Sequence, residues 1–266
     1  MKFNELGLCP ELLRVVEELG YEEPTPVQAK AIPPILKGRD MVGSAQTGTG
    51  KTAAFALPTL HRLANPGKCR ALALAPTREL AIQIEENFRT YGKYMRLKMA
   101  LLYGGVKYGK QLDQLRNNPD IVVATPGRLL DHIGQRNLDL RNIETLILDE
   151  VDRMLDMGFR PQIEEVFRGM PRRRQTMLFS ATMPNGVHDL ALRMTSDALW
   201  IEATPPGTTA DGIDERFYSV KPDRKNALLM SLINEPGWDQ VLIFTRTKAG
   251  ADVLEKLLQR EGIKAD

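Results

Sequence analysis

The stretch SAQTGTGKT, residues 44–52, decides the fold, and it follows the apolar pair Met41 and Val42. Successive backbone N–H groups in a glycine-rich turn form a concave anion site, and a helix that begins there adds its positive end. The Lys51 ammonium can reach the outer phosphates of a nucleotide, and the Thr52 hydroxyl can bind Mg²⁺. The stretch therefore predicts a phosphate-binding loop between a strand and a helix. Ala45 stands where the pattern G-x-x-x-x-G-K-[ST] has its first glycine, so the prediction also depends on the surrounding sequence.

Short apolar runs recur along the chain, and each is followed by a helical pattern. Their apolar residues are continuous rather than alternating, which is typical of strands buried on both faces of a parallel sheet. The stretches between them are amphipathic, as where Leu80, Ile84 and Phe88 recur at intervals of four. The sequence predicts an α/β fold with an open, doubly wound, mostly parallel sheet flanked by helices. The predicted strands lie within residues 40–45, 69–76, 98–105, 120–127, 144–150 and 175–182.

Each of these runs ends in a polar or glycine-bearing signature. In chain order the signatures are GTGKT, PTREL, GG, TPGR, DEVD and SAT. In open α/β sheets, ligands bind in the crevice beyond the carboxyl ends of the strands. The unusual residues of the chain are therefore predicted to lie where a ligand would bind.

Composition narrows the classes of protein that fit. The 266 residues carry 36 basic and 34 acidic side chains, a net charge of +2, which disfavours a protein that coats nucleic acid with a broad basic face. The run Arg172 to Arg174 is expected to be a solvated loop. Cys9 and Cys69 suggest no disulfide framework, and no apolar run approaches the ~20 residues that span a bilayer. The N-terminal residues have no signal-peptide pattern, so we expect a cytoplasmic protein without a membrane partner.

A boundary between two domains is predicted after residue 203. The stretch TPPGTTADG, residues 204–212, is rich in proline, glycine and threonine and is predicted to be a linker. Residues 1–203 would then form the first domain. Beyond the linker, strands are predicted over 213–220 and 240–245, with helices over 223–233 and 248–261. Residues 213–266 are too few for a stable parallel domain and are expected to be the incomplete beginning of a second one.

The run LILDE, residues 146–150, completes the argument for a nucleotide site. A P-loop ATPase needs acidic groups at a strand end to hold Mg²⁺ and to position a water molecule. Asp149 is predicted to hold the metal, partly through water, and Glu150 to act as general base or to orient the water. Such an acidic pair alone is often only a solvated strand end. Together with Lys51 and Thr52 in an α/β pattern, it predicts an ATP–Mg²⁺ site.

In order, the motifs resemble those of the DEAD-box ATP-dependent RNA helicases. They are GYEEPTPVQ (20–28), AQTGTGKT (45–52), PTREL (76–80), GG (104–105), TPGR (125–128), DEVD (149–152), SAT (180–182) and VLIF (241–244). Phe3 matches the isolated aromatic residue of that family's Q motif, here within residues 1–29. The flanking text DEVDRMLDMGF and RRRQTMLFSAT is similar to the bacterial RhlE-like branch. The resemblance covers essentially the whole chain and implies a RecA-like P-loop domain followed by the start of a second RecA-like domain.

The resemblance also implies roles for individual residues. Gln28 would read the adenine edge and Tyr21 would pack on the ring, with Lys51 also serving catalysis beside Asp149 and Glu150. A site that pairs with one base edge should prefer ATP to GTP. The remaining residues of the implied nucleotide site are Ala45, Gln46, Thr47, Gly48, Thr49, Gly50 and Thr52.

RNA is the implied macromolecular partner, held without regard to sequence. Glycines and helix N-termini bring backbone N–H groups close to phosphates without reading bases. The implied RNA-binding residues are Pro76, Thr77, Arg78, Gly104, Gly105, Thr125, Pro126, Gly127 and Arg128. Taken singly, these are also ordinary turn and helix-start residues. Asp152, Ser180 and Thr182 would couple ATP hydrolysis to RNA unwinding. Val151 departs from the alanine that names the family, and we expect it to change packing rather than catalysis.

Two alternatives remain open at this point. The chain could be another P-loop enzyme, such as a small-molecule kinase or a DNA-translocating helicase, although GYEEPTPVQ and PTREL argue against it. It could also be a nucleotide-gated binding module without catalysis, because the family's later ARGxD and HRxGRxxR segments do not occur in these 266 residues. Those segments hold the arginine finger, so weak hydrolysis is expected of this chain. Protein partners cannot be inferred from the sequence.

Overall fold

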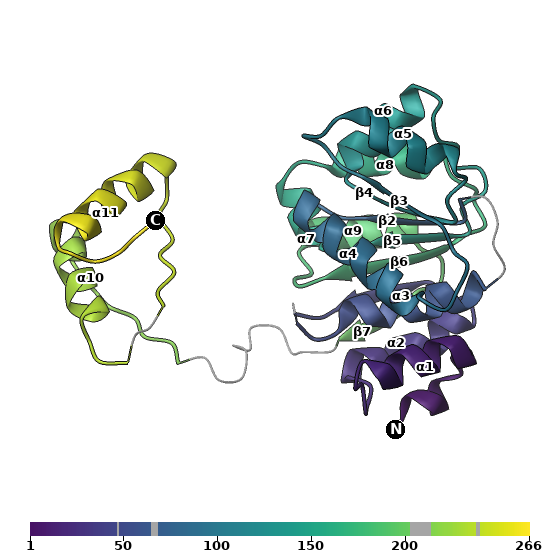
Figure 1. Ribbon diagram of the computed structural model, residues 1–266, viewed down its shortest axis with the longest axis horizontal. Coiled ribbons are helices and arrows are strands. Elements are labelled where there is room, and N and C mark those ends of the chain that lie inside the picture. The colour runs from purple at the N-terminus through teal and green to yellow at the C-terminus, as the bar shows by residue number, and fades with distance from the viewer. Residues whose placement is uncertain (47, 65–68, 203–213, 238–239) are drawn as a thin grey trace. The chain divides into compact units, whose positions relative to one another are not determined.

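The computed structural model describes residues 1–46, 48–64, 69–202, 214–237 and 240–266 (Figure 1). The chain divides into two compact units, Met1–Thr208 and Thr209–Asp266. The predicted linker, 204–212, lies outside the described residues, and the assignment of 213–266 to a second RecA-like domain stays a prediction. None of the helices in the described part of the chain is long and apolar enough to cross a membrane.

The first unit is built on a parallel sheet whose strand order is β3-β4-β2-β5-β6-β1-β7. Six of these strands confirm the predicted ones. The seventh was not predicted because only one of its faces is buried: Ile201 is buried, whereas Trp200 and Glu202 are exposed. The strands are β1 (Met41–Ser44), β2 (Ala71–Leu74), β3 (Met99–Leu102), β4 (Ile121–Ala124), β5 (Thr145–Leu148), β6 (Gln175–Ser180) and β7 (Leu199–Glu202).

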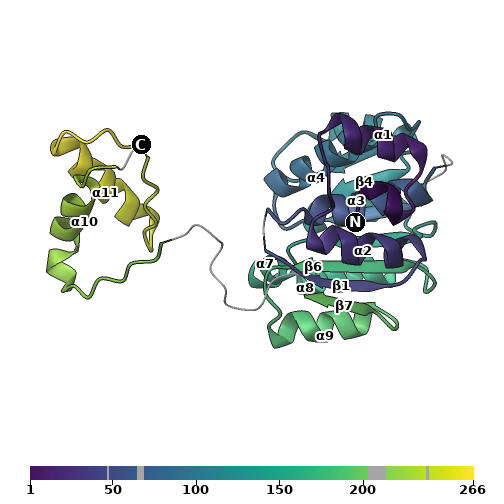
Figure 2. The ribbon, with the colours of Figure 1, turned by 90° about the horizontal axis from the view of Figure 1, so that it is seen from below.

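Helices cover both faces of this sheet (Figures 1 and 2). Alternate strand residues point to opposite faces, so Ala73 and Ile147 enter one apolar core while Leu74 and Leu148 enter the other. The first core is completed by η1 (Phe3–Leu6), α1 (Pro10–Glu18), α2 (Pro26–Leu36), α3 (Lys51–Arg62) and α4 (Arg78–Tyr91). The second is completed by α5 (Tyr108–Arg116), α6 (Pro126–Gly134), α7 (Val151–Asp156), α8 (Arg160–Arg168) and α9 (Asn185–Met194).

Buried carboxylates fix the amino edge of the sheet. Asp40, just before β1, accepts hydrogen bonds from the backbone N–H of Thr176 in β6 and of Ser196, both at 2.8 Å. Asp120, just before β4, accepts one from the backbone N–H of Lys98 at 2.8 Å. These contacts pair backbone donors where the strands begin. The amino ends of neighbouring strands are therefore held in register, and the loops at the opposite edge start from fixed positions.

The second unit contains η2 (Pro222–Arg224), α10 (Lys225–Ile233) and α11 (Lys248–Arg260) among its described residues. The predicted strands over 213–220 and 240–245 were wrong for the residues that are described there: these residues run without ladder hydrogen bonds. A strand is stable only when a neighbour pairs its backbone and its side chains gain burial. Phe217 and Phe244 are 91% and 89% exposed, so neither segment gains that burial.

Candidate functional site

The predicted phosphate-binding loop lies between β1 and α3. Gly48 and Gly50 have φ of +81° and +86°, a backbone conformation that glycine adopts without steric cost. Ala45, in place of the expected glycine, packs in the first apolar core, and its backbone N–H donates to the Ser180 carbonyl at 3.0 Å. It therefore continues the sheet, where a methyl group fits. The hydroxyl of Thr49 donates to the carbonyl of Gln46 at 2.8 Å, while Thr47 lies outside the described residues.

Lys51 opens α3 and carries the clearest sign of a ligand. Its side chain is only 6% exposed, and its Nζ has no hydrogen-bond partner among the described residues. A buried ammonium group without a partner loses its hydration and gains no contact in return. This desolvation costs on the order of several kcal/mol of free energy. An anion at the loop would supply the missing partner. The site therefore fits a phosphate group on the chemistry of its own donor.

Two acidic residues follow β5. Asp149 is 3% exposed, and burial raises its pKa to about 6, against the opposing attraction of the Lys51 charge. The backbone N–H of Glu150 donates to Asp149 Oδ1 at 3.0 Å. Glu150 itself has φ +53°, ψ 54°, a left-handed conformation that costs a residue with a Cβ about 1–2 kcal/mol. Such local strain is concentrated at functional sites. Glu150 also pairs with Arg153 at 3.3 Å.

A cavity of about 270 Å³ brings these groups together. Of the predicted nucleotide-site residues, it is lined by Tyr21, Gln28, Gly48, Gly50, Lys51, Thr52, Asp149 and Glu150. Four residues of α4 that were not predicted to be site residues also line it: Leu80, Gln83, Asn87 and Tyr91. In the part of the chain that the structure describes, no group of three or more His, Cys, Asp and Glu side chains could hold a metal ion by itself. A metal here would need ligands beyond Thr52 and Asp149, such as water and phosphate oxygens.

Gln28 has two structural contacts of its own. Its Oε1 accepts from the backbone N–H of Thr25 at 3.0 Å, and its Nε2 donates to the carbonyl of Gly50 at 3.2 Å. The first contact is half of a capping box at the start of α2, since Thr25 Oγ1 accepts in turn from the Gln28 backbone N–H. Each polar atom retains capacity for one further hydrogen bond. Gln28 therefore links α2 to the phosphate loop and still presents its amide to the cavity.

Asp152, Ser180 and Thr182 are in direct contact. Asp152 Oδ2 accepts from both the backbone N–H and the hydroxyl of Thr182, at 2.9 and 2.8 Å. The Asp152 backbone N–H donates to Ser180 Oγ at 3.1 Å. Burial acts to raise the pKa of Asp152, but these hydrogen bonds outweigh it, so the pKa lies below its usual value. The carboxylate ties the start of α7 to the residues after β6. Val151, beside it, is fully buried in the second core.

The predicted RNA-binding residues follow β2, β3 and β4, which are neighbours in the sheet. Thr77 and Thr125 are the N-cap residues of α4 and α6, and Pro126 is in the first turn of α6. Gly104 and Gly105 are exposed, and the Arg78 guanidinium lies over the Tyr103 ring at 5.0 Å. The sheet therefore separates two groups of residues: this one follows β3, β4 and β2, and the nucleotide group follows β5 and β1.

Arg128 is placed differently from the other residues of this group. Its side chain is only 10% exposed, and its Nη1 donates to the Val106 carbonyl at 3.2 Å. The guanidinium also lies 4.3 Å from the centre of the Tyr108 ring. These contacts fix the loop between β3 and α5. Arg128 thus shapes the loop that carries Gly104 and Gly105 more than it presents a free charge.

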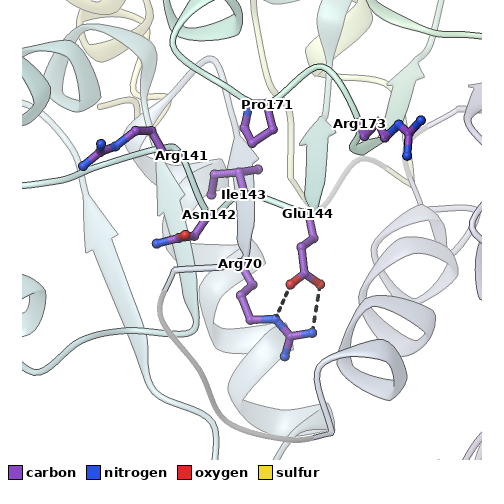
Figure 3. A pocket seen from close by; sticks show the side chains of 7 residues that line it. All are labelled: Arg70, Arg141, Asn142, Ile143, Glu144, Pro171 and Arg173. Atoms are coloured by element: carbon purple, nitrogen blue, oxygen red, sulfur yellow. Dashed lines mark hydrogen bonds and ion pairs between the residues drawn. The ribbon is translucent and has the colours of Figure 1, made fainter.

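A second hollow, of about 430 Å³, lies at the amino edge of the sheet (Figure 3). Arg70 Nε and Nη2 both donate to the Glu144 carboxylate at 2.8 Å. The side chains of Arg141 and Arg173 point away from one another, and Arg173 is exposed as expected for a solvated loop. Arg174, in the same run, instead stacks on the Phe167 ring at 3.8 Å. This hollow contains none of the predicted site residues.

Comparison with known proteins gives consistent matches. The family model described as DEAD/DEAH box helicase matches residues 25–190. The chain is 42% identical over 263 residues to the DEAD-box ATP-dependent RNA helicase RhpA of Helicobacter pylori, covering 99% of this chain and 54% of that protein. It is 41% identical over 265 residues to the DEAD-box ATP-dependent RNA helicase CshA of Bacillus cereus, covering 99% and 50%.

A solved structure, a DEAD box protein from the hyperthermophile Methanococcus jannaschii, is 36% identical with a TM-score of 0.74, and the match covers 98% of this chain and 71% of that one. The predicted fold class, RecA-like with a mostly parallel sheet, is thereby confirmed. The chain spans about half the length of the curated relatives it matches.

Proposed function

The chain belongs to the DEAD/DEAH box helicase family, and from that membership we propose that it is the nucleotide-binding part of an ATP-dependent RNA helicase. The observation that carries the proposal is the buried Nζ of Lys51 at the glycine loop, which has no hydrogen-bond partner within the described part of the chain and shares a cavity with Asp149 and Glu150. A cation so placed is suited to a polyphosphate. The substrate would be ATP, which relatives of the chain use according to their names.

Each residue of the cavity has a proposed role toward ATP and Mg²⁺. Lys51 and the backbone N–H groups of Gly48–Gly50 would hold the phosphates, with Ala45, Gln46, Thr47 and Thr49 shaping the loop. Thr52 and Asp149 would hold Mg²⁺, Asp149 partly through water. Bound Mg²⁺ neutralises negative charge on phosphate oxygens. Glu150 would orient an attacking water molecule and accept its proton. The half-exposed Tyr21 would pack on the adenine, and Gln28 would pair with its edge.

RNA would be held at the carboxyl ends of β2, β3 and β4. The N-termini of α4 and α6 and the loop at Gly104 and Gly105 present backbone N–H groups, which contact phosphates without reading bases. Pro76, Thr77, Arg78, Thr125, Pro126, Gly127 and Arg128 would complete this surface. The near-neutral charge of the chain fits a few directed contacts rather than a broad basic face. Binding is accordingly proposed to be independent of RNA sequence.

Asp152, Ser180 and Thr182 would couple hydrolysis to unwinding. Their hydrogen bonds join the helix after Glu150 to the end of β6, so a shift at one is transmitted to the other. Residues 1–203 would be the first RecA-like domain, and residues 213–266 part of a second. The 266 residues contain no ARGxD or HRxGRxxR segment, and we expect them to bind nucleotide but hydrolyse it slowly. The cytoplasm is the proposed location.

Calorimetry with Lys51→Ala tests the proposal. We expect an ATP affinity at least about tenfold below that of the unsubstituted chain, because a charge-assisted contact is lost. The matched control is Lys30→Ala, which removes an exposed lysine of α2 from the same unit and should leave the affinity unchanged. Equal ATP affinities for Lys51→Ala and the unsubstituted chain would overturn the assignment of the loop. Affinities measured for single-stranded RNA and for single-stranded DNA of the same sequence then separate an RNA helicase from a DNA-translocating enzyme.

A further inference from the structure

One side of α4 faces the nucleotide cavity along most of its length. Gln83, Asn87 and Tyr91 recur at intervals of four, and all three line the cavity together with Leu80. Residues four apart lie on the same side of a helix. From Leu80 to Tyr91 the helix rises by about 16 Å, a length comparable to that of an extended nucleoside triphosphate. Gln83, Asn87 and Tyr91 form the cavity stripe of α4.

The last residue of the stripe contacts Tyr21. The two phenol oxygens are 3.3 Å apart, and the rings meet edge to face with centroids 6.5 Å apart. Tyr91 is 4% exposed and Tyr21 is 38% exposed. Burial raises the pKa of Tyr91, so its hydroxyl keeps its proton across the physiological pH range. On its other side, Tyr21 meets the Phe3 ring, with centroids 6.2 Å apart. The exposed ring of Tyr21 is therefore held between a buried phenol and a buried phenyl group.

The middle residue of the stripe presents a free acceptor. Asn87 is half-buried, and its Nδ2 donates to the Gln83 carbonyl at 2.7 Å. Its Oδ1 has no hydrogen-bond partner among the residues that the structure describes, so it can accept from a hydroxyl in the cavity. Lys51, proposed to hold the phosphates, and Tyr21, proposed to pack on the adenine, line the same cavity. A hydroxyl-bearing group between phosphates and base is a sugar.

We propose that the cavity stripe of α4 is a wall of the nucleotide site, in which Tyr91 positions the Tyr21 ring and Asn87 accepts a hydrogen bond from a ribose hydroxyl. The proposal rests on the proposed function, since it assigns the sugar and base end of the same ATP site. Tyr91 acts through Tyr21 and is a positioning residue. Asn87, with Gln83 beside it, contacts the ligand and contributes to the preference for a ribose.

Binding of three ligands to the full 266-residue chain tests the proposal: ATP, 2′,3′-dideoxy-ATP and inorganic tripolyphosphate. We expect Asn87→Ala to weaken ATP by about threefold to tenfold, as for one lost hydrogen bond, and to leave dideoxy-ATP and tripolyphosphate unchanged. The matched control is Thr90→Ala. Thr90 is on the same helix and also donates to a carbonyl four residues earlier, that of Glu86, but it faces solvent. If Asn87→Ala and Thr90→Ala lower the affinity for ATP equally, the proposed contact between Asn87 and the ribose is wrong.

A double-mutant cycle tests the positioning role. Tyr91→Phe keeps the buried ring and removes only the hydroxyl, so we expect a loss of about threefold to tenfold for ATP and none for tripolyphosphate. Tyr21→Phe and the double substitution should each give the same loss, because both remove the same contact. Additive losses, or equal losses for ATP and tripolyphosphate, would overturn it. If the unsubstituted chain binds none of the ligands, the proposed function fails. If Lys51→Ala abolishes ATP binding but no substitution in the cavity stripe weakens it, the proposed function stands and the role of the stripe is overturned.

Discussion

Gln28 Nε2 donates a hydrogen bond to the carbonyl oxygen of Gly50 at 3.2 Å, and this contact joins the first turn of α2 to the N-cap residue of α3. Gly50 has no room for a side chain there. A Cβ atom at this position would lie 2.4 Å from Gln28 Nε2 and would occupy a left-handed backbone conformation with φ +86°. The side-chain amide of Gln28 therefore occupies the space that a side chain at position 50 would need.

Gly50→Ala should therefore damage both stability and binding. The left-handed conformation costs about 1–2 kcal/mol for a residue with a Cβ, and displacement of the Gln28 amide adds to it. We expect a lower unfolding midpoint in urea and weaker ATP binding by calorimetry. Gly109→Ala is the control, since a Cβ there meets nothing within 4 Å and its φ is not positive. If both alanines leave stability unchanged, the steric argument is wrong.

Gln28→Glu separates the two roles of this side chain. A carboxylate can still accept from the Thr25 backbone N–H, so the capping box survives, but it cannot donate to Gly50 or to a base. The new carboxylate would also lie buried against the Gly50 carbonyl oxygen, so we expect a lower unfolding midpoint together with a greater loss of affinity for ATP than for GTP. Affinities measured side by side for both nucleotides decide this. An equal loss for ATP and GTP would mean that Gln28 serves only the loop.

Thr182→Val should destabilise the first unit in a pH-dependent way. It removes a hydroxyl that donates to the Asp152 carboxylate at 2.8 Å, and Thr182 is exposed, so we expect a loss of about 1 kcal/mol at pH 7. Because the pKa of Asp152 is lowered in the folded state, this stabilisation is present above the unfolded pKa of about 3.9 and is lost as the pH falls through the folded pKa. Urea unfolding at pH 7 and pH 3 measures it.

The control for this substitution is Thr195→Val. The Thr195 hydroxyl donates at 2.8 Å to the neutral carbonyl of Ala191, so its loss should be the same at both pH values. A difference between the unsubstituted chain and Thr182→Val that persists undiminished at pH 3 would show that the carboxylate is not the acceptor that matters.

Cys69 should not react with thiol reagents in the folded protein. Burial raises its pKa to about 12, and its side chain is 7% exposed, so both the thiolate and access are lacking. We expect the rate of labelling at pH 8 to be the same for the unsubstituted chain and for Cys69→Ser. In denaturant the unsubstituted chain should take up one more label per molecule. Faster labelling of the folded unsubstituted chain would mean that the region around β2 opens readily.

Residues 1–266 should bind ATP, hydrolyse it slowly with little stimulation by RNA, and unwind no duplex. Charge developing on the γ-phosphate in the transition state needs a directed donor, and an arginine finger contributes on the order of 10³–10⁵ in rate in related systems. A steady-state ATPase assay with and without RNA, and a strand-displacement assay, measure this. Robust unwinding by these residues alone would contradict it.

The sequence predicted the sheet well because six of its strands are apolar on both faces, as at Leu72 and Ala73, which enter different cores. It missed β7 because one exposed face gives an alternating pattern over only four residues. It failed for residues 240–245 because an apolar run indicates a strand only if a neighbouring strand is there to pair with it. A local pattern carries no information on that neighbour.

The candidate site was partly predictable for the same kind of reason. Residues that follow parallel strands lie at the same edge of the sheet, so the sequence alone predicts that Lys51, Asp149 and Gly50 lie close together. Gln83 and Asn87 could not, because polar residues on an amphipathic helix usually mark its solvent face. Burial of Arg128 against Tyr108 was also hidden, since the aromatic partner lies on a different helix. Both cases depend on which helices pack together.

The carboxylates of Asp40 and Asp120 at the amino edge have a practical consequence for experiments in solution. Their hydrogen bonds to backbone N–H groups hold the first residues of the strands in register. Side chains in the exposed turns beside them can therefore be replaced without loss of these contacts. Asn117 and Asn118, in the turn before Asp120, are exposed and precede the amino end of β4, whereas Lys51, Asp149 and the predicted RNA-binding residues follow the carboxyl ends of their strands. A cysteine-linked dye or a surface tether placed in that turn would report on the domain without touching the ligands it is meant to observe.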